Sequence, residues 1–139
     1  MRRVTQSEYE TLAAFRYSLR KFLHFSEESA RGAGLTPQQH QALLAIKGFP
    51  GGAGRITISQ LADRMQLRHH STVGLVDRLE AQGLVCRESS HTDRRQVLVT
   101  LSAKGASMLE ELSAMHKEEL RRMLPELQGL IEQISTESR

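Results

Sequence analysis

The chain has 139 residues, of which 39% are hydrophobic and 25% are charged. This length suffices for one domain with a buried core. The sequence has no apolar run of about 18 residues, the minimum for a membrane helix, so we expect no membrane span and no membrane partner. Met1 and the arginines after it lead into polar residues rather than a secretory signal, and the single Cys86 forms no internal disulfide. We therefore expect a cytoplasmic protein.

The positive charge is concentrated in the middle of the chain. The formal net charge is only +3, and most of the 19 cationic residues are arginine. The central basic residues are Arg55, Arg64, Arg68, His69, His70, Arg78, Arg87, His91, Arg94 and Arg95. Acidic residues in the same stretch offset most of this charge, so the alternative to a basic patch is a solvated surface of mixed charge.

The N-terminal part predicts two helices. Apolar side chains recur with a helical period over residues 7–31, and the glycines at 32 and 34 end that helix. Thr36 followed by Pro37 is typical of a helix start, and the second helix runs to residue 47. Residues 49–54 are rich in glycine and proline and predict a loop, after which residues 55–57 predict a short strand.

The central part predicts two short helices and a hairpin. Thr57 and Gln60 have the spacing of a capping box, which starts a helix that runs to residue 65. After a break at residues 66–68, a second helix covers residues 69–82 and ends at Gly83. Its predicted buried face consists of Thr72, Leu75, Val76 and Leu79. Residues 84–88 and 96–101 predict two strands, joined by the polar segment 89–95.

The C-terminal part predicts a helix that Ser102 caps and that Pro125 interrupts. A separate last helix then carries Leu127, Leu130, Ile131 and Ile134. The expected fold is mainly α-helical with a small β-hairpin wing. It combines a winged helix-turn-helix lobe with N- and C-terminal helices whose apolar stripes one small lobe could not cover.

The paired helices and the hairpin predict a DNA-binding surface. In a helix-turn-helix, the second helix enters the major groove. Its candidate DNA-binding residues are Arg68, His69, His70, Ser71, Val73, Gly74 and Arg78, whose polar groups can bond bases or phosphates. Inside a helix, glycine costs about 1 kcal/mol relative to alanine. We therefore expect that Gly74 allows the backbone to approach DNA closely. The alternative is a surface helix with an incidental glycine.

The hairpin tip supplies the other candidates, which are His91, Asp93, Arg94 and Arg95. Arginine side chains can enter a minor groove, whose negative potential attracts guanidinium groups. We expect Asp93 to pair with a neighbouring arginine and hold the shape of the wing. The alternative is a solvated hairpin of mixed charge.

Residues 58–62, 75–85 and 93–105 resemble the MarR family of multiple-antibiotic-resistance-type regulators. The resemblance depends most on the Leu75–Leu79 segment Leu-Val-Asp-Arg-Leu and on Asp93-Arg94-Arg95 followed by Leu101-Ser102 and Gly105. It implies one MarR-like domain over residues 1–139, with dimerisation helices at about 7–31 and 104–139 and the winged helix-turn-helix lobe at about 36–102. Two departures are Arg68, where the family often has a capping Ser or Asp, and the absence of a reactive cysteine from the N-terminal helix.

The expected function is that of a sequence-specific, double-stranded DNA-binding transcriptional regulator. We expect a ligand-responsive repressor that binds a pseudo-palindromic operator as a homodimer. The resemblance also implies a cleft for a small aromatic or anionic effector, with Arg16, Tyr17, Arg20, His24, His40 and Met65 as candidate contacts. The alternative is a winged-helix protein-interaction module without specific DNA binding.

Catalytic and metal chemistry is not expected. The sequence contains no recognisable arrangement of nucleophile, base and orienting group and no phosphate-binding loop, so we predict neither an enzyme nor a cofactor. His24, Glu27 and Glu28 share one helix face, but such a cluster is more typical of a solvated surface than of a metal site. Cys86 is expected to be a small buried strand residue rather than a redox sensor.

Overall fold

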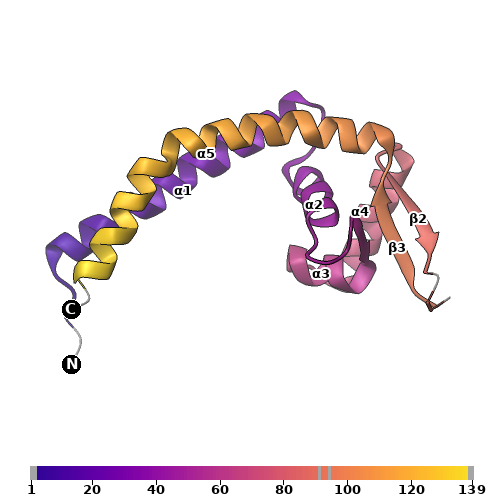
Figure 1. Cartoon of the computed structure of the whole chain (residues 1–139), viewed down its shortest axis with the longest axis horizontal. Coiled ribbons are helices and arrows are strands. Elements are labelled where there is room, and N and C mark those ends of the chain that lie inside the picture. Colours follow the sequence, from indigo (N-terminus) through magenta and orange to yellow (C-terminus); the bar gives the residue numbers. More distant parts are fainter. Residues whose placement is uncertain (1–2, 91, 94, 138–139) are drawn as a thin grey trace. The chain divides into compact units, whose positions relative to one another are not determined.

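The computed structural model describes residues 3–90, 92, 93 and 95–137, which form five helices and three strands (Figure 1). The elements are α1 (Gln6–Gly32), α2 (Pro37–Lys47), β1 (Arg55–Thr57), α3 (Ile58–Met65), α4 (His69–Ala81), β2 (Val85–Ser89), β3 (Val97–Leu101) and α5 (Ala103–Glu137). The chain divides into two compact units. The helical unit contains α1 up to Ser29 and α5 from Ser113, and the lobe is Ala30–Leu112.

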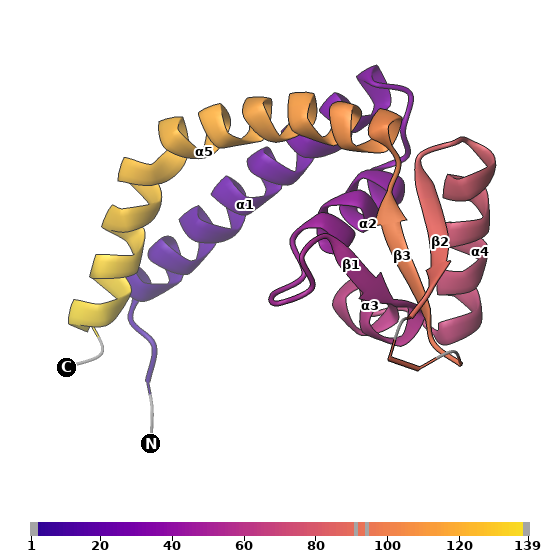
Figure 2. The ribbon, with the colours of Figure 1, turned by 45° about the vertical axis from the view of Figure 1, so that its right-hand side comes forward.

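In the helical unit, α1 and α5 run antiparallel and side by side (Figures 1 and 2). The α1 side chains buried in this unit are small and polar, namely Thr11, Ser18 and Ser26. The Ser18 hydroxyl donates a hydrogen bond to Glu126 Oε1 at 2.9 Å, and Ser26 Oγ lies 2.8 Å from His116 Nε2. The hydroxyl groups of Ser18 and Ser26 thus join α1 to a carboxylate and an imidazole ring of α5.

Much of the apolar stripe of α1 lies on its exposed side. Leu12, Leu19 and Leu23 keep 49%, 38% and 50% of their surface accessible in the single chain. Phe22 and Phe25 are half-buried and pack edge-on against the His116 ring. The helical unit thus leaves large apolar side chains uncovered along one helix.

The prediction that Pro125 separates two C-terminal helices is wrong. Helix α5 continues through Pro125 from Ala103 to Glu137. Proline lacks the N–H that would bond to the carbonyl of Arg121 and strains the preceding turn. A helix can continue past such a site when the remaining bonds and its packing against a neighbour hold it, and α1 supplies that neighbour.

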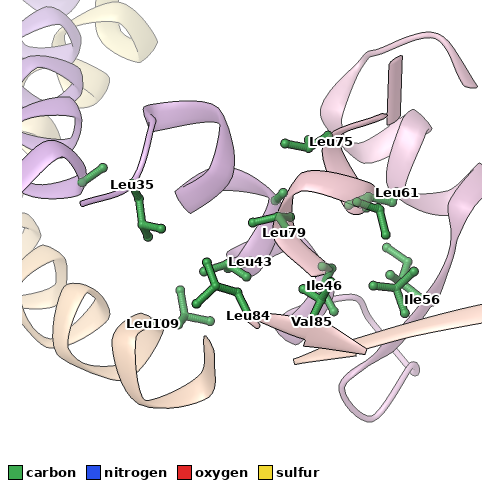
Figure 3. Close-up of a cluster of buried hydrophobic side chains, with 14 of the residues drawn as sticks. Leu35, Leu43, Ile46, Ile56, Leu61, Leu75, Leu79, Leu84, Val85 and Leu109 are labelled. Carbon is green, nitrogen blue, oxygen red and sulfur yellow. The ribbon is translucent and has the colours of Figure 1, made fainter. Parts of the chain in front are cut away.

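The lobe is built on a three-stranded antiparallel sheet in the order β1-β3-β2 (Figure 2). Val99 of β3 lies opposite Ile56 of β1 and Arg87 of β2, which fixes the register. The inward face of the sheet joins the helices in a leucine-rich core (Figure 3). Its fully buried members include Leu43, Ile46, Ile56, Leu61, Leu75, Leu79, Leu84, Val76 and Val99.

The predicted helix ends are confirmed in the lobe. Thr36 with Gln39 and Thr57 with Gln60 both form complete capping boxes. After α4, Gly83 has a φ of 73°, and the Leu84 N–H donates to the Leu79 carbonyl at 2.9 Å. This 6→1 hydrogen bond and the left-handed glycine form a Schellman motif, which provides hydrogen-bond donors for the last carbonyls of the helix.

The mainly α-helical fold with a hairpin wing is confirmed, and the short strand at residues 55–57 joins the hairpin as a third strand. The expectation of a buried Cys86 is wrong, because this cysteine is exposed. Val85 is buried in the core, and alternate residues of a strand face opposite sides. Within the described residues, no helix is long and apolar enough to span a membrane.

Candidate nucleic-acid interface

Helices α3 and α4 are joined by the tight turn 66–68. Gln66 adopts the left-handed conformation with a φ of 54°, and the Leu67 N–H donates to the Ala62 carbonyl at 2.9 Å. Arg68 is the N-cap of α4, in extended conformation and without a side-chain cap bond. The Arg68 carbonyl instead accepts the Thr72 hydroxyl at 2.9 Å, so the first turn of α4 is braced from within. Arg68 itself is exposed.

Helix α4 has one buried face and one polar, accessible face. Thr72, Leu75, Val76 and Leu79 are buried, as the helical period predicts. The other face exposes His69, His70, Ser71 and Arg78, while Val73 and Gly74 are half-buried. The predicted separation of core and surface residues on this helix is therefore confirmed.

Gly74 lies beside the Arg78 side chain on α4, with space for a Cβ atom at ordinary van der Waals distance. A Cβ atom at residue 74 would lie 3.5 Å from Arg78 Nη1. The Arg78 guanidinium thus lies back along α4 over Gly74, towards the first turns of the helix. A cation on that surface is suitable for a phosphate or a guanine edge.

The wing is held by hydrogen bonds around Ser90 and Asp93. The Ser90 hydroxyl accepts the Asp93 N–H at 3.3 Å, and the Ser90 N–H donates to the Gln96 carbonyl at 3.1 Å. Asp93 Oδ1 accepts the Arg95 N–H at 3.0 Å and lies 3.8 Å from Arg95 Nε. Asp93 thus pairs with a neighbouring arginine, and the Arg95 side chain is almost fully exposed. His91 and Arg94, also predicted here, lie outside the described residues.

Arg87 is one of the central basic residues but is not among the DNA-binding residues predicted from the sequence. From β2, its Nη2 contacts Asp77 Oδ1 at 2.6 Å and its Nη1 contacts Glu80 Oε1 at 2.7 Å. Both carboxylates belong to α4, so one guanidinium joins the wing strand to that helix. The three-residue spacing of Asp77 and Glu80 places them on one helix side, but the sequence does not show which cation meets them.

The segment from Ser102 to Gly105 fixes the start of α5 to the turn after α4. The Ser102 hydroxyl donates to the Gly83 carbonyl at 2.6 Å and accepts the Gly105 N–H at 3.0 Å. The Ser102 N–H donates to the Leu84 carbonyl at 2.9 Å. The serine and glycine of this motif thus have a structural role beside the wing.

The predicted effector contacts belong to both units. Arg16, Tyr17, Arg20 and His24 are exposed on α1, and the Lys21 ammonium lies 4.8 Å from the centre of the Tyr17 ring. In the lobe, His40 is only 3% exposed and Met65 is half-buried against the core. Their grouping into one site stays a prediction. Among the described side chains, no three His, Cys, Asp or Glu residues are placed to hold a metal ion.

Comparison with protein families gives a match to the MarR family over residues 33–96. The chain is 33% identical over 112 residues to the HTH-type transcriptional regulator YcgE of Bacillus subtilis strain 168, covering 79% of this chain and 70% of YcgE. It is 31% identical over 97 residues to the HTH-type transcriptional repressor MdtR of the same organism. That match covers 70% of this chain but only 60% of MdtR, so the chain spans about three fifths of that relative.

Solved structures share the fold at lower identity. The MarR family transcriptional regulator AbsC from Streptomyces coelicolor has a TM-score of 0.74 at 23% identity, covering 98% of this chain and 93% of AbsC. A mutant of MarR from E. coli, complexed with operator DNA, has a TM-score of 0.65 at 22% identity, covering 86% of this chain and 89% of the MarR chain. NadR in complex with 4-hydroxyphenylacetate has a TM-score of 0.69 at 21% identity, covering 99% of this chain and 94% of NadR.

These findings agree with one another and with the geometry. The family match covers α2, β1, α3, α4 and β2, which include the helix pair and the first strand of the wing. The YcgE match extends over most of the chain, and the AbsC fold matches nearly all of it. The chain therefore belongs to the MarR family.

Proposed function

We propose that this chain is a sequence-specific, double-stranded DNA-binding transcriptional regulator that acts in the cytoplasm. The observation that carries the proposal is the accessible face of α4, where His69, His70 and Ser71 lie on the first turn and are held by a fully buried opposite face. Short polar side chains at the start of such a helix can reach base edges in the major groove. The MarR structure with operator DNA supports this assignment.

The wing supplies the second contact with DNA. The exposed Arg95 follows a turn that Asp93 and Ser90 hold by hydrogen bonds, so its backbone is fixed while its side chain stays accessible. A guanidinium presented in this way suits the negative potential of a minor groove. The relatives MdtR and YcgE are named as a transcriptional repressor and a transcriptional regulator, and no catalytic step is part of the proposal.

The regulator acts as a homodimer in this proposal. Tyr9, Leu12, Leu19 and Leu23 of α1 are exposed in the single chain, as are Met115, Leu120, Leu124, Ile131 and Ile134 of α5. Soluble monomers rarely expose so many large apolar side chains on adjoining helices. A second copy, related by a two-fold axis, would cover both helices. Two-fold symmetry in the protein then requires a pseudo-palindromic site, with half-site centres about 10 bp apart.

A small aromatic or anionic effector lowers DNA affinity in this proposal, which makes the protein a ligand-responsive repressor. Arg16 and Arg20 are exposed on α1 and can bind a carboxylate, and Tyr17 offers a ring face beside them. The NadR structure with 4-hydroxyphenylacetate and the name of the repressor MdtR support this part. Linkage requires the effector to prefer the DNA-free dimer, and a tenfold preference corresponds to about 1.4 kcal/mol.

The test of DNA binding is a selection from random duplexes, followed by a salt titration of the selected site. A regulator should enrich a pseudo-palindrome, and log K should fall linearly with log salt because phosphate contacts release counterions. An unrelated duplex of equal length is the control and should bind at least about a thousandfold more weakly. No enrichment and no salt-dependent binding would instead favour a protein-interaction module.

The test of the effector is calorimetry with salicylate and 4-hydroxyphenylacetate, with and without the selected duplex. We expect weaker effector binding when DNA is present. Equal affinity in both states would show that the compound binds without regulating. Arg20→Gln is the diagnostic variant, because it should weaken the carboxylate contact and leave DNA affinity unchanged in the absence of effector.

A further inference from the structure

Both acidic residues of α4 are held by one arginine that comes from the wing strand. Asp77 and Glu80 are three positions apart on the helix. Asp77 accepts a hydrogen bond from Arg87 Nη2 at 2.6 Å, and Glu80 accepts one from Arg87 Nη1 at 2.7 Å. The Arg87 side chain is 26% exposed, whereas Asp77 and Glu80 are 60% and 45% exposed. The cation is thus the more enclosed partner, and the carboxylates form the accessible edge.

The register of the sheet explains why Arg87 reaches α4. Arg87 lies opposite Val99, and Val99 lies opposite Ile56, so the three side chains share one sheet face. Val99 and Ile56 are fully buried in the core, which identifies that face as the inner one. Arg87 stands at the edge of this inner face and extends along it to the helix. The planar guanidinium fork, with its separate nitrogens, suits two carboxylates at once.

The two carboxylates lie on the helix that carries the proposed base-reading residues. Asp77 precedes Arg78, and Glu80 is one helical turn beyond Val76. DNA carries one negative charge for every 1.7 Å or so of its axis, so an unbalanced carboxylate within about 8 Å of phosphate is repelled at physiological salt. Asp77 and Glu80 would therefore oppose docking of α4 unless a cation balances them.

We propose that Arg87 is a positioning residue for DNA binding, which acts by neutralising the Asp77–Glu80 edge of α4. The inference rests on the proposed function and adds to it a residue that need not touch DNA itself. Arg87 thereby makes the affinity of α4 for DNA depend on the wing strand.

The experiment compares the wild type, three Arg87 variants and one control variant on the duplex selected by the wild type and on an unrelated duplex. Arg87→Gln should weaken binding to the selected duplex about tenfold at about 0.15 M salt, because two carboxylates lose their counter-charge. Arg87→Lys should have a DNA affinity between those of the wild type and Arg87→Gln, since one ammonium group can pair well with only one of the two carboxylates. Arg87→Gln combined with Asp77→Asn and Glu80→Gln should recover binding to within about threefold of the wild type.

Arg55→Gln is the matched control. Arg55 also extends from a strand of this sheet and forms a 2.6 Å ion pair, in this case with Glu88 on the opposite sheet face. The variant removes the same charge from the lobe and breaks a comparable pair away from α4. We expect its DNA affinity to change less than about threefold. Circular dichroism and thermal unfolding of every variant show whether the fold is retained.

Salt and rescue separate the outcomes. The defect of Arg87→Gln should shrink as salt rises from about 0.05 to about 0.3 M, because screening weakens repulsion by the carboxylates. An unchanged DNA affinity of Arg87→Gln would overturn the inference. A loss of affinity that persists in the triple variant would overturn it as well, since Arg87 would then contact DNA or only support the fold. Failure of the wild type to select any duplex would instead refute the proposed function.

Discussion

Gly105 lies so close to the Leu84 carbonyl oxygen that a Cβ atom at residue 105 would stand 2.1 Å from it. The obstacle is backbone, which cannot rotate away as a side chain can. The contact occurs where the first turn of α5 meets the turn after α4, beside the bonds of Ser102 to Gly83 and Leu84. The glycine of the Leu-Ser-x-x-Gly segment is thus required by close packing of two backbones.

Gly105→Ala should lower the free energy of unfolding by about 2 kcal/mol, because the added methyl group must displace the Leu84 backbone. Urea unfolding followed by circular dichroism measures this effect. Gly129→Ala is the control in the same helix, where a Cβ would meet nothing within 4 Å. That change should raise stability by about 0.5–1 kcal/mol, because alanine is the better helix former. Equal effects of the two substitutions would contradict the close contact.

Thr57→Ala should destabilise the lobe by about 1 kcal/mol, since it removes the side-chain half of the capping box at the start of α3. In that box the Thr57 hydroxyl accepts the Gln60 N–H at 3.1 Å, and Gln60 Oε1 accepts the Thr57 N–H at 2.9 Å. Thr57→Ser keeps the hydroxyl and should stay within about 0.5 kcal/mol of the wild type. Thermal unfolding of the three proteins tests the cap, and a serine variant as unstable as the alanine variant would refute it.

Local features of the lobe could be predicted from the sequence because each has a short-range physical cause. The buried face of α4 follows from residue spacing, and the helix starts at Thr36 and Thr57 follow from hydroxyl groups placed to accept backbone N–H groups. The turn at Gly83 has a positive φ, which glycine adopts without a steric penalty. None of these features needs knowledge of a distant part of the chain.

The features that could not be predicted depend on contacts between distant segments. Arg87 is ten residues from Asp77, and only the packing of β2 on α4 brings them together. Cys86 and Val85 are adjacent, and the strand register decides which one enters the core. Pro125 breaks an isolated helix, whereas here the neighbouring α1 supports α5 beside the proline, as the Ser18–Glu126 bond shows.

His70→Ala and Ser71→Ala should each reduce discrimination between the selected duplex and random DNA by about 1–3 kcal/mol, the range for a good base contact. Both side chains are exposed on the first turn of α4. Competition binding with the two duplexes measures the ratio of affinities. Gln38→Ala, an exposed position on α2, is the control and should leave the ratio unchanged. A variant that loses specific and non-specific binding equally would identify its residue as a phosphate anchor.

Asp93→Ala should weaken DNA binding several-fold, although the change removes a negative charge from the wing. By charge alone, the substitution would strengthen binding to phosphate. The structure predicts the opposite sign, because Asp93 Oδ1 holds the Arg95 N–H at 3.0 Å and so fixes the wing turn. Asp93→Asn retains an oxygen acceptor and should bind at least as well as the wild type. Tighter binding by the alanine variant would show that the turn needs no such support.

Leu19→Glu combined with Leu23→Glu should convert the homodimer into monomers at micromolar concentration. Both leucines are exposed in the single chain, so the substitutions cost little in the fold of one copy. In the dimer they would bury two carboxylates from each copy, which is costly without partners. Sedimentation velocity gives the mass of each protein. Glu27→Lys, also exposed on α1, is the control and should leave the wild type's mass unchanged.

The same variant separates dimerisation from DNA recognition. A monomer retains the α4 surface and the wing, so it should still bind DNA in the salt-dependent, non-specific mode. It loses the second half-site, and its affinity for the selected pseudo-palindrome should fall by at least about a hundredfold, because the two lobes no longer bind as one unit. Gel shift with full and half sites measures this difference. Two results would show that the homodimer is not the DNA-binding species. The wild type would sediment as a monomer, or the double variant would bind full and half sites as the wild type does.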